Sequence, residues 1–278
     1  MKAHSISLLS IVLLTVAAVA AQGSQLASAK VVDVVGTVTK YTAGGDQAPL
    51  QKGDILKEGD SVSVTALSEA KLVFSNGSEL TIEENTSVNI AKLQQEAFAG
   101  NKSYEQLQAD PSQSQTLLEL NYGRLSGHVK KLRPDSSFNV DTPLGTAAIR
   151  GTKWSALLIY NAERGEFLLT VKNYDGLVDI ISRYIGQFEY GEGNIGDKGY
   201  DASISETTRE LIPRDHTIVI RLREGDPYFD DLFDLIKNFI PDGPQPVITP
   251  GPGPGPGPGP DDDLGIIVVS PETTQSAE

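Results

Sequence analysis

Short runs of alternating apolar and polar side chains dominate residues 30–222. Gly, Asp and Asn separate these runs, and they favour turns. The clearest hairpin turns at Asn76-Gly77, because Asn-Gly accepts the positive φ angles of a tight primed turn. Apolar side chains alternate on both sides of it, at Leu72, Phe74, Leu80 and Ile82. The pattern predicts successive β-strands, each with one face toward a core and one toward water.

Three stretches depart from this alternation. Residues 92–116 are rich in Gln without a period of two, and we expect a helical insertion that stops at Asp110-Pro111. Residues 183–202 are rich in Gly and Tyr and are expected to form a long exposed loop or hairpin tip. Residues 226–240 repeat apolar side chains at spacings of three and four, which predicts a short amphipathic helix packed on the β domain.

These patterns together define the expected fold. It is all-β: a multi-stranded antiparallel sandwich or a short solenoid-like domain over residues 30–222, with a helical insertion and a C-terminal amphipathic helix. A chain of this length can bury a core of its own. The absence of Cys excludes disulfides, thiol catalysis and Cys-metal sites.

The first 21 residues have the order of a secretory signal peptide. Lys2 precedes an uncharged apolar run over residues 6–20, and small residues that suit a cleavage site follow. A run of about 15 residues is short for a membrane span, which needs roughly 20. We therefore expect cleavage, a secreted or periplasmic location and no membrane span in the mature chain. An uncleaved membrane anchor is the alternative.

The composition changes again after residue 240. Residues 241–263 form a Pro/Gly-rich spacer that ends in three Asp, and its period of two excludes a collagen strand. We expect it to be extended and unfolded. Residues 264–278 begin with a strand-like apolar peptide, which can add to the sheet edge of a neighbouring molecule and so allow self-association. The alternative is that this peptide pairs within its own chain or stays disordered.

Charge and motif spacing narrow the chemistry. A net charge of -14 repels phosphate backbones, so nucleic acid is excluded as a partner. Residues 191–196 match G-x-G-x-x-G, but no helix follows to meet a pyrophosphate. His128 and His216 lack metal-ligand spacing. We predict no catalytic, cofactor-binding or metal-ligating residues; a hydrolase would need one of these His beside both a Ser and an Asp.

Two blocks of sequence carry a resemblance to a known family. The first block has two Gly-Asp pairs, at residues 53–54 and 59–60, ahead of the Asn76-Gly77 hairpin. The second contains Phe138, Val140, Thr142-Pro143, Gly145, Arg150-Gly151-Thr152 and Trp154. Both resemble the FecR-domain family of bacterial envelope proteins. The resemblance implies a periplasmic β domain used in sensing and signalling.

The predicted signal peptide decides which form of the family the chain resembles. Family members that regulate sigma factors place a cytoplasmic segment before a membrane span, so the stand-alone secreted form is the better match. We expect a non-enzymatic module that binds an envelope protein or a glycan. The alternative is a structural or assembly protein of the cell surface that uses its C-terminal strand.

Two groups of residues are candidates for special roles. We assign a structural role to Thr142, Pro143, Gly151, Thr152 and Arg150, whose guanidinium, if buried, must bond carbonyls or a carboxylate near Thr142-Pro143. An anion-binding role for Arg150 is the alternative. Exposed aromatic side chains on a loop can stack on sugars or dock a protein. The candidate binding loop is therefore defined by Tyr184, Phe188, Tyr190 and Tyr200.

Overall fold

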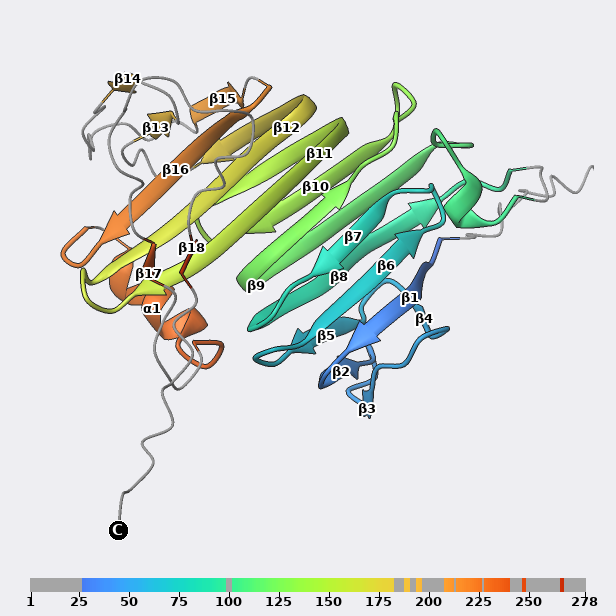
Figure 1. Ribbon diagram of the computed structural model, residues 1–278, viewed down its shortest axis with the longest axis horizontal. Coiled ribbons are helices and arrows are strands. Elements are labelled where there is room, and N and C mark those ends of the chain that lie inside the picture. Colours follow the sequence, from blue (N-terminus) through green and yellow to red (C-terminus); the bar gives the residue numbers. More distant parts are fainter. Residues whose placement is uncertain are drawn as a thin grey trace, which may run out of the picture.

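The computed structural model confirms an all-β fold built on one mixed sheet (Figure 1). It describes residues 27–98, 102–182, 188–190, 194–196, 208–212, 214–226, 228–240, 247–248 and 266–267. The predicted signal peptide over 1–21 lies outside the described residues, as do most of the spacer over 241–263 and of the tail over 264–278. No helix in the described ranges is long and apolar enough to cross a membrane.

The strands divide into a short N-terminal set and a long central set. The first set is β1 (Ala29–Val35), β2 (Val38–Tyr41), β3 (Gln47–Pro49), β4 (Ile55–Leu56), β5 (Ser61–Val64), β6 (Glu69–Phe74), β7 (Glu79–Ile82) and β8 (Thr86–Gln95). The second set is β9 (Ser114–His128), β10 (Ser137–Thr142), β11 (Gly145–Asn161), β12 (Glu166–Ser182), β13 (Phe188–Tyr190), β14 (Asn194–Gly196), β15 (Thr208–Ile212) and β16 (His216–Arg223).

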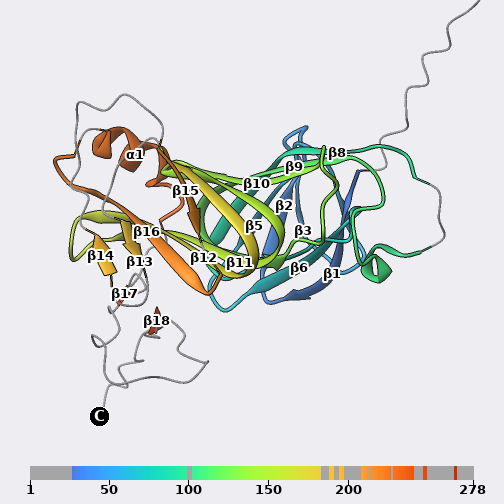
Figure 2. The same ribbon diagram turned by 90° about the horizontal axis from the view of Figure 1, so that it is seen from above.

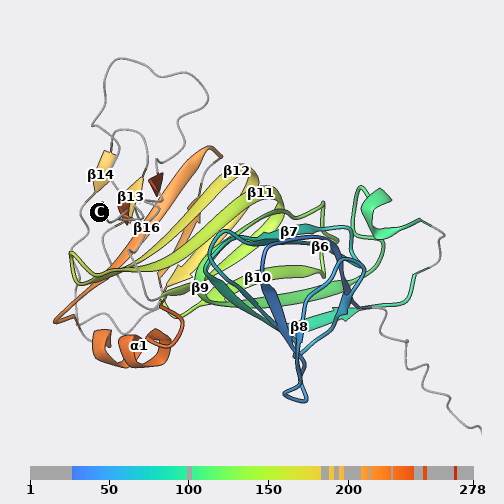
Figure 3. The ribbon, with the colours of Figure 1, turned by 60° about the horizontal axis from the view of Figure 1, so that its bottom comes forward.

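The sheet folds back on itself into two layers, which Figure 2 shows from above. The first layer runs in the order β3, β2, β5, β8, β9, β10, β11, β12, β15. The second runs in the order β4, β1, β6, β7, β9, β11, β12, β16, β13, β14. Figure 3 shows β6 and β7 of the second layer across from β8 of the first.

Three long strands, β9, β11 and β12, belong to both layers. β9 pairs with β8 over residues 114–122 and with β11 over residues 123–128. β12 pairs with β16 over residues 166–173 and with β15 over residues 178–182. Each strand therefore bends once and continues into the opposite layer. The chain passes around the core once, between β9 and β10, and then reverses direction at each of the antiparallel pairs β10–β11 and β11–β12, so the architecture is mainly that of a sandwich.

One pair of neighbouring strands corrects the expectation of a fully antiparallel sheet. β9 and β10 are parallel, with Ser137 opposite Gln115 and Asp141 opposite Glu119. Parallel neighbours need a crossover between them. The second half of β9 supplies it, because it passes through the second layer before residues 129–136 return the chain to the first. β10 then runs in the same direction as the start of β9.

The core lies between the two layers and is closed by aromatic contacts across them. The ring of Phe74, on β6, meets that of Phe138, on β10, edge to face at 5.5 Å between centroids. Phe138 in turn lies 6.2 Å from the only tryptophan of the chain, Trp154 on β11. All three side chains are fully buried. Alternate positions of the strands supply the rest of this core, as the period of two predicts.

The helix α1 (Phe229–Ile236) covers the end of the β11–β12 hairpin and confirms the predicted amphipathic helix. Its buried side chains are Phe229, Leu232 and Ile236. Phe233 packs edge to face on Tyr160 at 5.2 Å between ring centroids. The helix thus continues the apolar interior where the strands end.

The predicted helical insertion over 92–116 is much reduced. Residues 92–95 continue β8, and β9 already begins at Ser114. Helical structure among the described residues between them is one 3-10 turn, η1 (Tyr104–Gln106). The sequence shows no alternation of apolar and polar side chains here because several side chains that face the core are polar. These are Gln95, Ser114 and Thr116, all of them buried.

Candidate functional site

On one side of the β domain, the chain passes between the layers at four adjacent places, which we call the corner. These are residues 129–136 between β9 and β10, 150–153 within β11, 174–177 within β12, and the turn between β15 and β16. The first two are joined by a bond from the Val129 amide to the Thr152 carbonyl, 2.9 Å long. The corner is thus a stack of neighbouring crossings.

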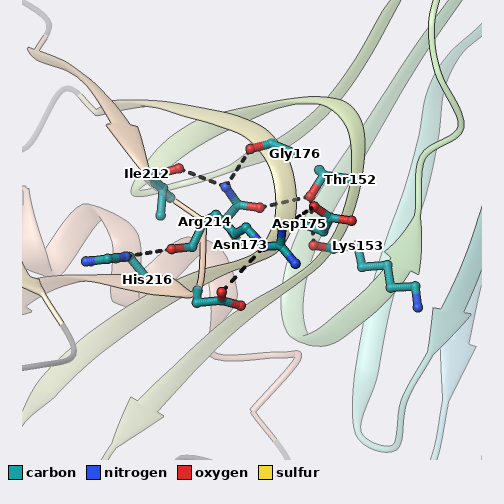
Figure 4. A network of polar contacts seen from close by, with 9 residues as sticks. Thr152, Lys153, Asn173, Asp175, Gly176, Ile212, Arg214 and His216 are labelled. Carbon is teal, nitrogen blue, oxygen red and sulfur yellow. Dashed lines mark hydrogen bonds and ion pairs between the residues drawn. The ribbon is translucent and has the colours of Figure 1, made fainter. Parts of the chain in front are cut away.

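Asn173 ties three of these crossings together (Figure 4). Its side-chain amide donates to the carbonyls of Ile212, at 2.8 Å, and Gly176, at 3.2 Å. Its carbonyl oxygen accepts from the Thr152 hydroxyl at 2.9 Å. Asn173 and Thr152 are both fully buried. Because a buried polar group left without partners costs stability, this network holds the corner in one arrangement.

Two glycines allow the strands to bend at the corner. Gly151 and Gly176 have φ angles of +58° and +94°, in the left-handed region that favours glycine. A Cβ atom on Gly176 would lie 2.4 Å from the Gly151 carbonyl oxygen. Gly151 therefore lies at a bend of β11, and Thr152 bonds to Asn173 beside it. No sequence motif pointed to Asn173.

Thr142 and Pro143 lie away from the corner, in the turn between β10 and β11. The Thr142 hydroxyl donates to the Gly145 carbonyl at 2.8 Å and accepts from the Gly145 and Leu144 amides at 3.1 and 3.2 Å. Pro143 has no amide to satisfy, which suits this place. The geometry accords with a structural role for both residues.

Arg150 differs from its expected setting. Its side chain is exposed, and the described hydrogen bond of its guanidinium is a long one, 3.4 Å, to the Ser136 carbonyl. That carbonyl belongs to the crossing before β10, so the bond joins two crossings of the corner and does not contact the Thr142-Pro143 turn. Burial was the condition for that role, and burial is absent.

An open groove of about 650 Å³ lies against the corner on the outer face of the second layer. Residues from β7, β9, β11, β12 and the β15–β16 turn line it. Among them are Glu79, Ser126, His128, Lys153, Tyr174 and Arg214. Lys172 extends its ammonium over the Tyr174 ring, 4.6 Å from the centroid, which fixes the ring at the groove.

His128 is held neutral in this groove at physiological pH. Burial lowers the pKa of the imidazole, and the nearby Lys130 ammonium lowers it further. Lys130 Nζ lies 3.2 Å from His128 Nδ1 and 2.7 Å from a Glu79 carboxylate oxygen. A neutral His128 can hydrogen-bond a ligand without adding charge.

The described residues do not assemble a hydrolytic triad. Ser126, beside His128 in the groove, donates its hydroxyl to Glu83 at 2.9 Å, and His128 Nδ1 faces Lys130. His216 Nδ1 bonds instead to the Arg214 carbonyl at 2.7 Å. Within the described ranges, no three His, Asp or Glu side chains cluster to hold a metal ion.

The predicted aromatic binding loop is only partly described. Tyr184 and Tyr200 lie outside the described residues. Phe188 and Tyr190 begin and end β13, which pairs with β14 and, through Glu189 and Tyr190, with β16. The backbone of this hairpin is described and its side chains are not, so a binding role stays a prediction.

The sequence match of residues 60–178 to the model of the FecR protein family decides the assignment. The chain contains a FecR domain. The matched segment includes β5 to most of β12, and with them Thr142, Gly151 and Asn173. FecR is a regulatory family, and the match supports a role in signalling.

Two solved structures show a distant similarity. Both are of a putative anti-sigma factor from Parabacteroides distasonis, determined at 2.50 and 1.65 Å resolution. Each has 11% sequence identity and a TM-score of 0.31, with 59% of either chain covered. The chain thus spans less than two thirds of the length of these proteins. No curated protein matches the chain.

Proposed function

We propose that this protein is a non-enzymatic, extracytoplasmic signalling module whose FecR domain binds a protein or glycan of the bacterial envelope. The observation that carries the proposal is the match of residues 60–178 to a regulatory family. The corner and its groove are built largely from that same segment. The predicted signal peptide supports a location outside the cytoplasm.

The geometry of the groove supports binding. Its walls are strands and crossings held by the buried Asn173 network, so a ligand meets a surface already in place. Tyr174 provides an exposed ring, and Lys153 and Arg214 provide cations. Aromatic and cationic side chains of this kind recur at recognition surfaces.

Site-specific cross-linking tests this proposal directly. We would replace Tyr174 with a photo-reactive phenylalanine and irradiate living cells. The matched control places the same group at Tyr41, on β2, since both tyrosines are 37% exposed. We expect an adduct at position 174 that is absent at position 41, and mass spectrometry and glycosidase digestion would distinguish protein from glycan. Equal adducts at both positions, or none at 174, would contradict the proposal.

Location requires a separate measurement. Cell fractionation and N-terminal sequencing should find the mature protein outside the cytoplasm, shortened by about 21 residues, in line with the usual length of signal peptides. A chain that keeps Met1 and stays with the cytoplasmic fraction would contradict the extracytoplasmic part of the proposal.

The alternative of a surface assembly protein gains no support from the described residues. Ile266 and Ile267 of the C-terminal peptide form β18, which pairs with β17 (Val247–Ile248) of the same chain. Addition of this peptide to a neighbouring sheet stays a prediction. Removal of residues 264–278 should lower self-association in analytical ultracentrifugation if the alternative holds.

A further inference from the structure

Four exposed cations at the corner have no ionic partner among the described residues: Lys131, Arg133, Arg150 and Lys153. Many other bases are paired with acids, as Lys40 is with Asp54 at 2.6 Å. The whole chain carries 37 acids and 23 bases, so acids are abundant. A surface that leaves several bases unpaired in so acidic a protein is suited to an anionic partner.

The backbone places these cations side by side. A Cβ on Gly151 would lie 3.7 Å from the Cα of Lys131, which sets the loop of Lys131 against the bend of β11. Arg150 reaches the Ser136 carbonyl, and the Ser136 amide bonds to the carbonyl of Arg133 at 3.1 Å. All four cations thus belong to two touching crossings. We call them the basic strip.

The basic strip continues into the groove through Lys153, one of the residues that line it. Across the groove, Arg214 makes two long ion pairs, 3.6 Å to Asp175 and 3.5 Å to Asp215. All three of these side chains are more than 60% exposed, so solvent screens both pairs strongly. An anionic ligand could therefore replace Asp175 and Asp215 as the partner of Arg214 with little loss of binding free energy.

Apolar surface accompanies the strip. Leu177 is the cross-strand neighbour of Arg150, and its side chain is 55% exposed on the same face. Leu211, on the edge strand β15, is also half exposed. A polypeptide can meet cations and leucines together, because carboxylate and aliphatic side chains can stand side by side on one chain. An anionic polysaccharide has no aliphatic side chains to offer.

We propose that the basic strip and the adjoining groove bind an acidic segment of a partner protein, one in which Asp or Glu residues flank an aliphatic side chain. This inference rests on the proposed binding function and names the chemistry of the partner. Four neighbouring crossings about 4.8 Å apart extend over roughly 15 Å, which matches four or five residues of extended peptide.

A binding assay with a defined probe tests the inference. The probe is a short fluorescent peptide of Asp, Leu and Gly, and a second peptide carries Asn in place of Asp. Fluorescence anisotropy is measured on the full chain at about 0.1 M salt, where charges beyond roughly 10 Å are screened. We expect the Asp peptide to bind and the Asn peptide to bind at least about tenfold more weakly.

Charge reversal locates the site. R150E/K153E should weaken binding of the Asp peptide about tenfold or more. The control K52E/K57E makes the same charge change at two exposed lysines away from the corner, which also lack an ion pair among the described residues, and should change binding less than about twofold. Circular dichroism confirms that both variants fold. Equal weakening in the two variants would overturn the inference.

Two further outcomes would overturn it in distinguishable ways. If polygalacturonate binds more tightly than the Asp peptide and loses affinity in R150E/K153E, the ligand is a glycan. If a chain that ends at Pro260 binds the peptide about tenfold more tightly than the full chain, the strip is occupied by the chain's own Asp261–263. An adduct at Tyr174 in cells without peptide binding would leave the proposed function standing and remove only this inference.

Discussion

Gly176 shows how a single residue sets the shape of the corner. Its φ of +94° costs any other residue conformational energy, and its missing Cβ leaves room for the Gly151 carbonyl. Gly45 has nearly the same φ, +89°, but nothing lies within 4 Å of its Cβ position. A side chain at either glycine would therefore strain the backbone, but only at Gly176 would it also overlap neighbouring atoms.

Alanine at these two positions should have unequal effects. Gly176→Ala should lower the free energy of unfolding by about 2 kcal/mol more than Gly45→Ala, because only the former drives a Cβ into a carbonyl oxygen. Urea denaturation of the two variants measures the difference. Similar losses in both would show that strain alone accounts for the effect.

Asn173 should be the most sensitive polar residue of the corner. Asn173→Ala removes the amide that the Ile212 and Gly176 carbonyls accept from and one of the two acceptors of the Thr152 hydroxyl, and we expect a loss of about 3 kcal/mol. Thr152→Val removes the bonds of one hydroxyl, to Asn173 and to the Lys153 carbonyl, but keeps both bonds of the Asn173 amide, and it should cost about 1 kcal/mol. Thermal unfolding distinguishes the two; a loss in Asn173→Ala no greater than in Thr152→Val would contradict the network.

Glu105 should give the stability a measurable acid dependence. The hydrogen bond from Lys30 and then backbone contact lower the pKa of this carboxyl from 4.5 to about 2. An acid with a lowered folded pKa stabilises the protein above its unfolded value, so this contribution is full above about pH 4.5 and lost toward pH 2. Both side chains are over a third exposed, which limits the contribution to less than about 1 kcal/mol.

The test compares Glu105→Gln with the exposed control Glu163→Gln. We expect Glu105→Gln to be the less stable variant in urea denaturation at pH 6, and the difference between the two to shrink steadily as the pH falls from about 4.5 to about 2. A difference of the same size at both pH values would point to lost packing and not to charge.

Sequence reasoning located part of the corner at the residue scale. Gly151 and Thr152 could be singled out because they belong to the block that resembles the FecR family. Asn173 could not, since two of its partners are backbone carbonyls, one of them 39 residues along the chain, and any sequence supplies carbonyls. The burial of Arg150 was left as a condition, because exposure depends on what other strands cover, which a local pattern does not record.

At the scale of elements, α1 illustrates how a short helix depends on what it covers. Eight residues are too few to hold a helix in water without tertiary contacts. Phe229, Leu232 and Ile236 supply those contacts against the β11–β12 end of the core. Leu235 points away and is 62% exposed.

Two matched substitutions separate the faces of this helix. Leu232→Asp would bury a charge without a partner, and we expect a loss of about 3 kcal/mol together with faster proteolysis after residue 228. Leu235→Asp makes the same chemical change in water and should stay within about 0.5 kcal/mol of the parent. A large effect of Leu235→Asp would mean that its face is also covered.

The sequence analysis predicted β8 and β9 too short, because polar side chains face the core at the end of β8 and at the start of β9. Gln95 donates to Asp110 at 3.4 Å, and Ser114 donates to the same carboxylate at 2.7 Å, all three being buried. Burial still alternates with a period of two along β8 and β9. A search for alternating apolar side chains misses it, because the buried residues here are polar. Where inward side chains are aliphatic or aromatic, as in β6 and β7, the strands were predicted correctly.

For the whole molecule, the long strands make the β domain one cooperative unit. β9, β11 and β12 contribute to both layers, so neither layer can unfold and leave the other intact. The fluorescence of Trp154, the chain's one tryptophan, and the far-ultraviolet circular dichroism should therefore give the same midpoint in urea. Two separate transitions would show that the N-terminal strands unfold independently.

The bends at Gly151 and Gly176 also restrict how such a chain can change in length. Each passage of the chain through the corner, as in β11 and in β12, adds one strand to each layer, so neighbouring strands must keep their register in both layers. An insertion that ended inside one layer would lengthen that layer without a matching strand in the other. Relatives should therefore differ by complete strands that span both layers, or else by excursions at strand ends such as the one between Gln95 and Ser114.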